Sequence, residues 1–327
     1  MSPAPGEPIV APPGASPPRP TRPWVRPVLR LAQSFLLAAI LYFLVTYLQR
    51  SWTSIEGYDW TLRPGWLFLS ALAFLAFYFS QAFAWWLLLR GFQLASPLSV
   101  ATATWAKSIL ARYLPGNVFM FVGRAWMCHT QGLSVERVSA AMVYEQALGV
   151  CSALVMLAVF FPFWEYRPGL TALGLIALPV LVGLLHPRVF GPLAARLLFL
   201  LRRPPLGVVL TFGRVVALLA YYTATWLLAG AGAWLLGRAI VDLEVEALPL
   251  VIATYALAYV AGMAAFVFPS GIGVREAVLT ASLARWLPGG VALAWALFLR
   301  LWVTVVELAF VGLAVGVDLL IRRWRPR

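Results

Sequence analysis

Two short polar segments interrupt long apolar stretches of the sequence, and they contain the residues best suited to bind a ligand. The first segment, RYLPGN at 112–117, is followed by Arg124. The second, FPSGIGVRE at 268–276, ends with Arg275 and Glu276. Both combine Pro and Gly, which end or kink helices, with arginines, whose guanidinium groups bind phosphate oxygens in a bidentate manner. These residue types predict a binding site for an anionic group such as a phosphate.

The second segment offers small residues directly before an expected helix, namely Ser270, Gly271 and Gly273. The first turn of a helix has unpaired backbone N–H groups and a positive partial charge, so it attracts anions. The glycines would let a headgroup approach the backbone closely, and Arg275 would bind phosphate oxygens. Glu276 would either hold Arg275 in place or attract a cationic headgroup.

The first segment offers the same chemistry through Arg112 and Arg124, with Asn117 as a candidate helix cap after the Pro-Gly turn. Glu145 lies a couple of turns inside the next apolar stretch, where a carboxylate needs a partner. We expect it to pair with Arg112 or Arg124, in a structural or a functional role. The alternative for both segments is that Pro and Gly end a helix and each arginine extends to the membrane interface.

The composition indicates a membrane protein. Hydrophobic residues make up 62% of the chain and charged residues only 11%, with a mean hydropathy of +0.86, outside the range of soluble domains. A charge at mid-bilayer costs about 2.5–3.5 kcal/mol, and irregular backbone at that depth must be covered by protein or line a watery cavity. The net charge of +13 does not indicate nucleic-acid binding, because the arginines cluster at the ends of apolar runs, where they orient spans and meet lipid headgroups.

The apolar runs predict an all-α, polytopic membrane helix bundle with about 6–8 spans. The expected spans and helices lie at 28–48, 65–89, 138–163, 170–185, 208–236, 248–268 and 291–321, with a broken stretch at 100–127 and a short helix at 273–287. In domain terms, residues 1–27 form a disordered, Pro- and Arg-rich cytoplasmic tail, residues 28–321 the transmembrane domain, and residues 322–327 a basic cytoplasmic end.

The distribution of arginines predicts the orientation in a plasma (inner) membrane. Both termini and the segment 186–203 are rich in arginine and are expected in the cytoplasm. The acidic segment 242–246 is expected outside. With this orientation, the stretch 100–127 enters and leaves from the cytoplasmic side and the stretch 248–287 from the opposite side. Two oppositely oriented broken hairpins of this kind are typical of inverted-repeat transporters. The alternative is eight or more plain, kinked spans.

Other polar residues in the apolar stretches are expected to serve packing. Arg300 and Glu307 are seven residues apart on one helix face and are predicted to form an ion pair. Tyr221 and Tyr222 could line a cavity, although a helix-packing role is favoured.

The sequence shows no motif of a familiar enzyme class. It contains no P-loop, no paired-Asp motif, no Gly-x-Ser-x-Gly elbow, and no His, Cys or Glu cluster with metal-ligand spacing. We therefore expect no cofactor, no metal and no catalytic residue, and a transporter is favoured over an enzyme. An enzyme stays open, because Glu145 or Glu276 could act as a base.

Three motifs, in the same order along the chain, resemble those of the lysyl-phosphatidylglycerol synthase transmembrane (flippase-like) family. They are RYLPGNV at 112–118 continuing to Arg124, YEQ at 144–146, and the segment 268–276. The family pattern runs YLPG, then a Glu-containing helix, then PGGLGVRE, so Ser270 and Ile272 are mild departures. The resemblance extends from about residue 29 to the end.

The resemblance implies an integral membrane protein that moves a phospholipid or polyprenyl-linked lipid between leaflets, or supports that movement. Bifunctional relatives carry a further membrane block and a soluble aminoacyl transferase domain. A chain without them is expected to be a standalone member that makes no lysyl-lipid. The expected partner is a membrane lipid with an anionic headgroup, and a homodimer or a lipid-synthesis enzyme is a further candidate. Two rival functions are a membrane-embedded transferase acting on a lipid phosphate and a non-catalytic subunit of a lipid-synthesis complex.

Overall fold

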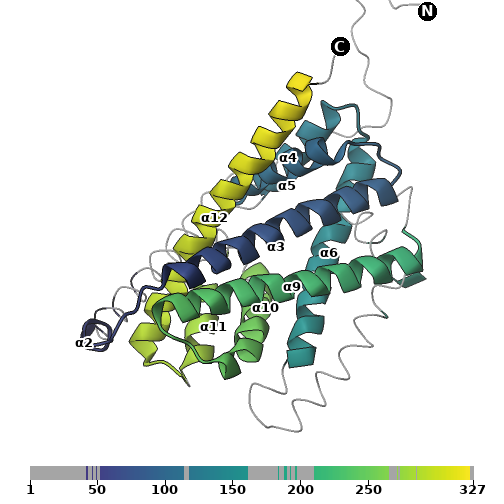
Figure 1. Ribbon diagram of the computed structural model, residues 1–327. Helices are drawn as coiled ribbons and strands as arrows, with labels where there is room; N and C mark the ends of the chain where they lie inside the picture. The colour runs from purple at the N-terminus through teal and green to yellow at the C-terminus, as the bar shows by residue number, and fades with distance from the viewer. Residues whose placement is uncertain are drawn as a thin grey trace, which may run out of the picture.

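The computed structural model describes residues 52–113, 118–160, 210–264, 271, 273–284 and 286–324, with eight single positions between 42 and 196. All regular secondary structure in the described part of the chain is helical (Figure 1). The elements are α2 (Trp52–Glu56), α3 (Pro64–Gly91), α4 (Leu98–Ile109), η1 (Leu110–Tyr113), α5 (Val118–His129), α6 (Val135–Phe160), α9 (Phe212–Ile240), η3 (Val245–Ala247), α10 (Leu248–Ala264), α11 (Val274–Leu283) and α12 (Gly289–Trp324).

Five helical segments in the described part of the chain are long and apolar enough to cross a membrane: α3, α6, α9, η3 with α10, and α12. The prediction of a polytopic helical membrane bundle is therefore confirmed. The observed bounds agree with the expected spans to within a few residues. The expected tail at 1–27 and the expected spans at 28–48 and 170–185 lie outside the described residues, apart from isolated positions.

Helices α3 and α9 lie side by side and antiparallel (Figure 1). Backbone hydrogen bonds join the start of α3 to the end of α9, with Arg63 N–H donating to the carbonyl of Ala239 at 3.0 Å. Further along the pair, a Cβ on Gly232 would lie 3.0 Å from the ring of Phe74. The hydroxyl of Ser70 donates to the carbonyl of Gly232 at 2.7 Å. Small residues permit this close approach, which stabilises helix pairs where lipid removes the hydrophobic driving force.

The chain also forms two broken helical hairpins, α4–η1–α5 and α10–α11. Helices α4 and α5 have 12 residues each and α11 has 10, so they are about 15–18 Å long. A hydrocarbon core is about 30 Å thick. None of these three helices can cross it alone, so each must end inside the bundle or at one face of it.

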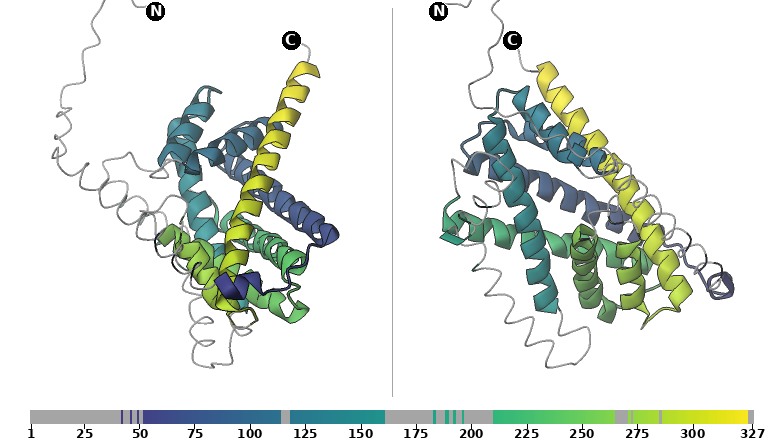
Figure 2. Two further views of the ribbon diagram at one scale, coloured as in Figure 1. Left: turned by 90° about the vertical axis from the view of Figure 1, so that its left-hand side faces the viewer. Right: turned by 180° about the vertical axis from the view of Figure 1, so that it is seen from behind.

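The two hairpins lie at opposite ends of α12 (Figures 1 and 2). Trp105 of α4 contacts Phe310 in the C-terminal half of α12, with ring centroids 5.8 Å apart. Leu279 and Leu283 of α11 pack in one cluster with Trp295 in its N-terminal half. The opposite membrane orientation expected for the hairpins stays a prediction.

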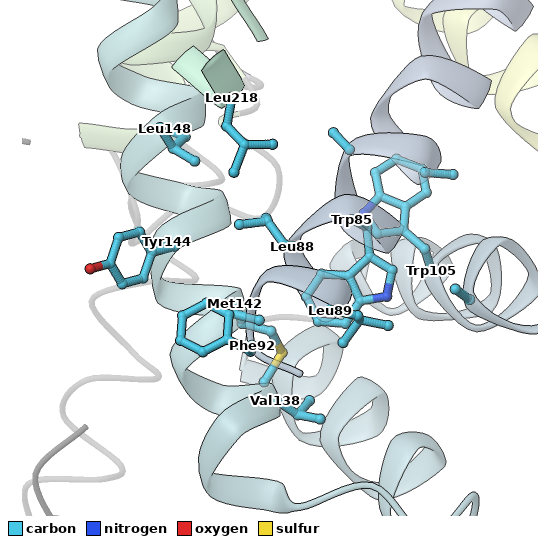
Figure 3. Close-up of a cluster of buried hydrophobic side chains, with 14 of the residues drawn as sticks. Trp85, Leu88, Leu89, Phe92, Trp105, Val138, Met142, Tyr144, Leu148 and Leu218 are labelled. Atoms are coloured by element: carbon cyan, nitrogen blue, oxygen red, sulfur yellow. The ribbon is translucent and has the colours of Figure 1, made fainter. Parts of the chain in front are cut away.

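The buried apolar side chains form two clusters, one at each end of the bundle. The first cluster joins α4, α5 and the N-terminal half of α6 to the C-terminal half of α3. Figure 3 shows part of it, including Trp85, Leu88, Phe92 and Met142. The second joins α10, α11 and the N-terminal half of α12 to α9. The clusters hold both hairpins against the long helices.

Candidate functional site

A cavity of about 300 Å³ lies where the two broken hairpins meet the long helices. Each long helix contributes lining residues from the middle third of its length. Examples are Gln81 of α3, Gln146 of α6, Tyr222 of α9 and Val303 of α12. The hairpins line it with the residues nearest their breaks: Ile109, Met120, Phe121, Arg124, Tyr259, Gly262, Met263, Gly271 and Arg275. If the long helices cross a membrane, the cavity therefore lies near the middle of the bilayer.

Arg124 is held in the cavity wall by a hydrogen bond, an ion pair and contacts with two indole rings. Its side chain is almost completely buried, with 1% of the residue exposed. Its Nε donates to the hydroxyl of Ser108 at 2.8 Å, and its guanidinium lies 4.8 Å from the ring centroid of Trp85 and 5.8 Å from that of Trp105. The two indoles are visible in Figure 3. Cation–π contacts with buried rings favour a charged guanidinium at this position.

Glu145 is the ionic partner of Arg124. One carboxylate oxygen forms an ion pair with Nη1 of Arg124, and the other accepts a hydrogen bond from Nε1 of Trp105 at 2.6 Å. The expected pairing of Glu145 with one of the two arginines is thus found with Arg124. The pair is nearly fully buried, and its two charges compensate each other, as buried charges require.

Two glycines shape the second break. Gly271 has φ +65° and Gly273 has φ +86°, conformations that residues with a Cβ adopt only with strain. A Cβ on Gly271 would also lie 2.7 Å from the Cα of Gly262 in α10. At Gly271 the chain therefore packs backbone against backbone on α10, and both glycines of this contact line the cavity.

Arg275 lies in the cavity wall at the start of α11. Its guanidinium carbon lies 5.8 Å from the ring centroid of Tyr255. Its aliphatic stem packs on Gly262, where a Cβ would lie only 2.9 Å from Cγ of Arg275. Among the described residues, no carboxylate lies within ion-pair distance of its guanidinium. Arg275 therefore gives the described lining of the cavity a positive charge that the lining does not neutralise.

Glu276 acts as the cap of α11. It is 2% exposed; one oxygen accepts the backbone N–H of Gly273 at 2.6 Å, and the other forms an ion pair with Arg300. It is not among the residues that line the cavity. A carboxylate at a helix N-terminus is favourable. Here the carboxylate of Glu276 takes the place at the start of α11 where a bound anion was expected.

The predicted pairing of Arg300 with Glu307 is wrong. Arg300 pairs with Glu276 of α11, while Glu307 accepts a hydrogen bond from the hydroxyl of Tyr78 at 2.9 Å. Seven residues along a helix correspond to about 10 Å. That separation is too long for a direct contact, whereas α11 places Glu276 directly beside Arg300.

Two polar groups of the lining were not predicted to belong to the site. The hydroxyl of Tyr222, which is 2% exposed, and Oε1 of Gln81 are buried without a hydrogen-bond partner among the described residues. Both side chains line the cavity. A helix-packing role was favoured for Tyr222, and the only sequence signal for Gln81 is a lone amide in an apolar run.

The structure thus brings Arg124, Glu145, Gly271 and Arg275 to one cavity, with Gly273 and Glu276 adjoining it. The other predicted site residues are not placed. Asn117 and Ser270 lie outside the described residues, and only the backbone of Arg112 is described.

A family model described as "Lysylphosphatidylglycerol synthase TM region" matches residues 28–312. The matched segment contains both hairpins and every residue named above in the cavity wall. Comparison with curated proteins gave no match.

Proposed function

Because the chain belongs to the lysylphosphatidylglycerol synthase TM region family, we propose that it moves a phospholipid or polyprenyl-linked lipid between the leaflets of the membrane. In this proposal the protein resides in the plasma (inner) membrane with both termini in the cytoplasm. The substrate headgroup enters the central cavity, and its phosphate binds Arg275.

The observation that carries the proposal is the position of Arg275. Its guanidinium lies in a cavity at the middle of the long helices without a carboxylate partner among the described residues. An uncompensated charge at this depth is unfavourable, and an anionic ligand would remove the penalty. A guanidinium also matches the geometry of a phosphate, because two of its N–H groups can bind two phosphate oxygens.

The two hairpins supply a route for alternating access. They approach the cavity from opposite ends of α12, and a short displacement of either hairpin would open the cavity toward one face. Transporters built from inverted repeats work by this kind of movement around a fixed central site. The chain has no nucleotide-binding motif, so we propose passive or ion-coupled movement.

The remaining predicted residues have supporting roles in the proposal. Arg124 and Glu145 keep the wall polar and rigid at the first break, with Arg112 and Asn117 completing that side of the site. Ser270, Gly271 and Gly273 bring backbone close to the headgroup at the second break. Glu276 orients the start of α11, which carries Arg275. A homodimer and a lipid-synthesis enzyme partner stay predictions.

The test is exchange of fluorescent lipids between leaflets of liposomes that contain the purified protein. We expect protein-dependent exchange of at least one phosphate-containing lipid, against protein-free liposomes as the baseline. Turnover of a lipid phosphate in detergent without exchange would favour the transferase. Co-purification with a lipid-synthesis enzyme, with neither exchange nor turnover, would favour the non-catalytic subunit.

A further inference from the structure

We infer that Arg300 of α12 is a positioning residue for Arg275, because its ion pair with Glu276 fixes the start of α11, which carries Arg275. The inference rests on the proposed function, since it concerns the arginine proposed to bind the phosphate. Arg300 itself is not among the residues that line the cavity. It would therefore act on Arg275 through α11, without contacting the substrate.

The start of α11 depends on the side chain of Glu276. The helix has only 10 residues, and a helix of this length is marginal without support from its surroundings. One oxygen of Glu276 accepts the backbone N–H of Gly273 at 2.6 Å, which closes the first turn. Arg275 lies inside this turn, so its side chain moves whenever the turn moves.

Arg300 is what keeps the Glu276 carboxylate in this place. The side chain of Glu276 is 3% exposed, and its second oxygen forms an ion pair with Arg300. No other basic side chain of the described residues lies within ion-pair distance of Glu276. A buried carboxylate that loses its only counter-charge is strongly unfavourable. It would take up a proton or turn away, and either change weakens the cap of α11.

The part of α12 that carries Arg300 is itself held by the α3–α9 pair. The indole of Trp302 donates to the hydroxyl of Ser70 at 3.1 Å, and that hydroxyl donates to the carbonyl of Gly232 at 2.7 Å. Residues two apart on a helix are separated by about 200°, so Trp302 and Arg300 can contact different neighbours. A continuous series of polar contacts thus leads from α3 and α9 through α12 to the start of α11.

The contacts of Arg275 with α10 are of a different kind. Helix α11 packs against both α10 and α12 (Figure 1). On the α10 side, the aliphatic stem of Arg275 packs on Gly262 and its guanidinium lies over the ring of Tyr255. Apolar contacts have no preferred direction, whereas hydrogen bonds depend on angle as well as distance. The contacts on the α12 side therefore decide where the guanidinium of Arg275 lies.

The test is leaflet exchange in liposomes that contain the full-length protein, measured at increasing mole fractions of a fluorescent probe lipid. Fluorescent phosphatidylglycerol and a fluorescent polyprenyl phosphate are used in parallel, as the two lipid sources. This titration gives the maximal rate and the probe fraction at half of that rate. A misplaced Arg275 weakens phosphate binding and raises the half-saturating fraction. A general loss of folded protein lowers only the maximal rate.

Arg300→Met removes the charge and keeps a side chain of similar length. We expect it to raise the half-saturating fraction at least about fivefold. Adding Glu276→Gln should restore most of this loss, because the amide oxygen can still accept the N–H of Gly273 and no charge is left unpaired. Circular dichroism and size-exclusion profiles show whether each variant is folded. If Arg300→Met does not fold, Arg300→Gln provides the comparison.

The matched control is Arg322→Met on the same helix. Arg322 also pairs with a buried carboxylate, that of Asp318, but neither residue lines the cavity. Its half-saturating fraction should equal that of the natural chain. A further comparison places Arg300→Met in an Arg275→Ala background. Because Arg300 acts through Arg275, the added substitution should not lower the exchange rate below that of Arg275→Ala alone.

The inference is overturned if folded Arg300→Met keeps the natural half-saturating fraction, or if it lowers exchange by the same factor with and without Arg275. In both cases, exchange that depends on Arg275 leaves the proposed function standing. If the exchange of neither probe depends on Arg275, the proposed phosphate site is refuted and the role of Arg300 with it.

Discussion

The guanidinium of Arg124 in α5 forms an ion pair with the carboxylate of Glu145 in α6, and both side chains are almost completely buried. The pair joins the first broken hairpin to a long helix at the cavity wall. Because neither side chain can reach water and each charge is compensated mainly by the other, the position of the hairpin depends on the pair.

Removing one partner of this pair should destabilise the protein more than removing both. Glu145→Leu leaves Arg124 buried without its carboxylate, and such changes cost about 3–5 kcal/mol. The double variant with Arg124→Leu removes both charges and should recover a large part of that loss. Thermal unfolding in detergent measures the difference. A loss in the double variant equal to the sum of the losses in the two single variants, Glu145→Leu and Arg124→Leu, would show that the two side chains are not coupled.

Gly271 should not tolerate a side chain. It has φ +65°, and a Cβ would lie 2.7 Å from the Cα of Gly262. The left-handed conformation alone costs a residue with a Cβ about 1–2 kcal/mol. Gly271→Ala should therefore lower the melting temperature and reduce lipid binding in the cavity. The matched control is Gly312→Ala in α12, where a Cβ would meet no atom within 4 Å. An equal melting temperature for both variants would contradict the observed packing of the second break.

The stability of the protein should fall in acid partly through Asp242, which lies outside the spans. Both its oxygens accept hydrogen bonds from Arg63, at 2.6 and 2.8 Å. These bonds, together with the charges of Arg63 and Arg238, hold the pKa of Asp242 below its usual value. The folded-state pKa is thus lower than the unfolded-state pKa of about 3.9. The stabilisation is fully present above that unfolded value and is lost as the pH falls through the folded-state pKa.

Asp242→Asn tests this contribution with little change of shape, and Asn tolerates the positive φ of 48° at this position. At neutral pH the variant should melt at a lower temperature than the natural chain. The gap should narrow as the pH is lowered below about 4. A gap that stays constant with pH would mean that the charge of Asp242 does not contribute.

The proposed orientation predicts which loops face the cytoplasm. Thr130, in the turn between α5 and α6, and Glu246, in η3 before α10, are both exposed. In a background without Cys128 and Cys151, Thr130→Cys should react with an impermeant maleimide only from the cytoplasmic side. Glu246→Cys should react only from the opposite side. Labelling of both positions from one side would exclude the oppositely oriented hairpins.

The spans were predictable because their cause is local. An apolar run of sufficient length bounded by Pro, Gly or charge gives the bounds of a membrane helix, and the stretch expected at 65–89 is observed as α3, Pro64–Gly91. The two breaks were predictable for the same reason. In each break Pro and Gly lie close together, and both disfavour a continuous helix through local backbone effects.

The partners within the site were only partly predictable, because they depend on which helices pack together. Glu145 had two candidate partners in the sequence, and the structure pairs it with Arg124. Arg300 was paired with the wrong carboxylate, since the sequence does not show that α11 lies beside α12. Gln81 was missed because a lone amide has no characteristic spacing, and only the tertiary structure places it at the cavity.

The binding of a lipid phosphate by Arg275 during translocation is tested most directly by leaflet exchange in liposomes that contain Arg275→Ala. The matched control is Arg90→Ala, which removes an exposed arginine at the end of α3, away from the cavity. We expect Arg275→Ala to reduce the exchange rate at least about tenfold, because a charge-assisted bidentate contact is lost. Arg90→Ala should exchange lipid at the natural rate. Full exchange by a folded Arg275→Ala variant would contradict the assignment of this cavity as the site of phosphate binding.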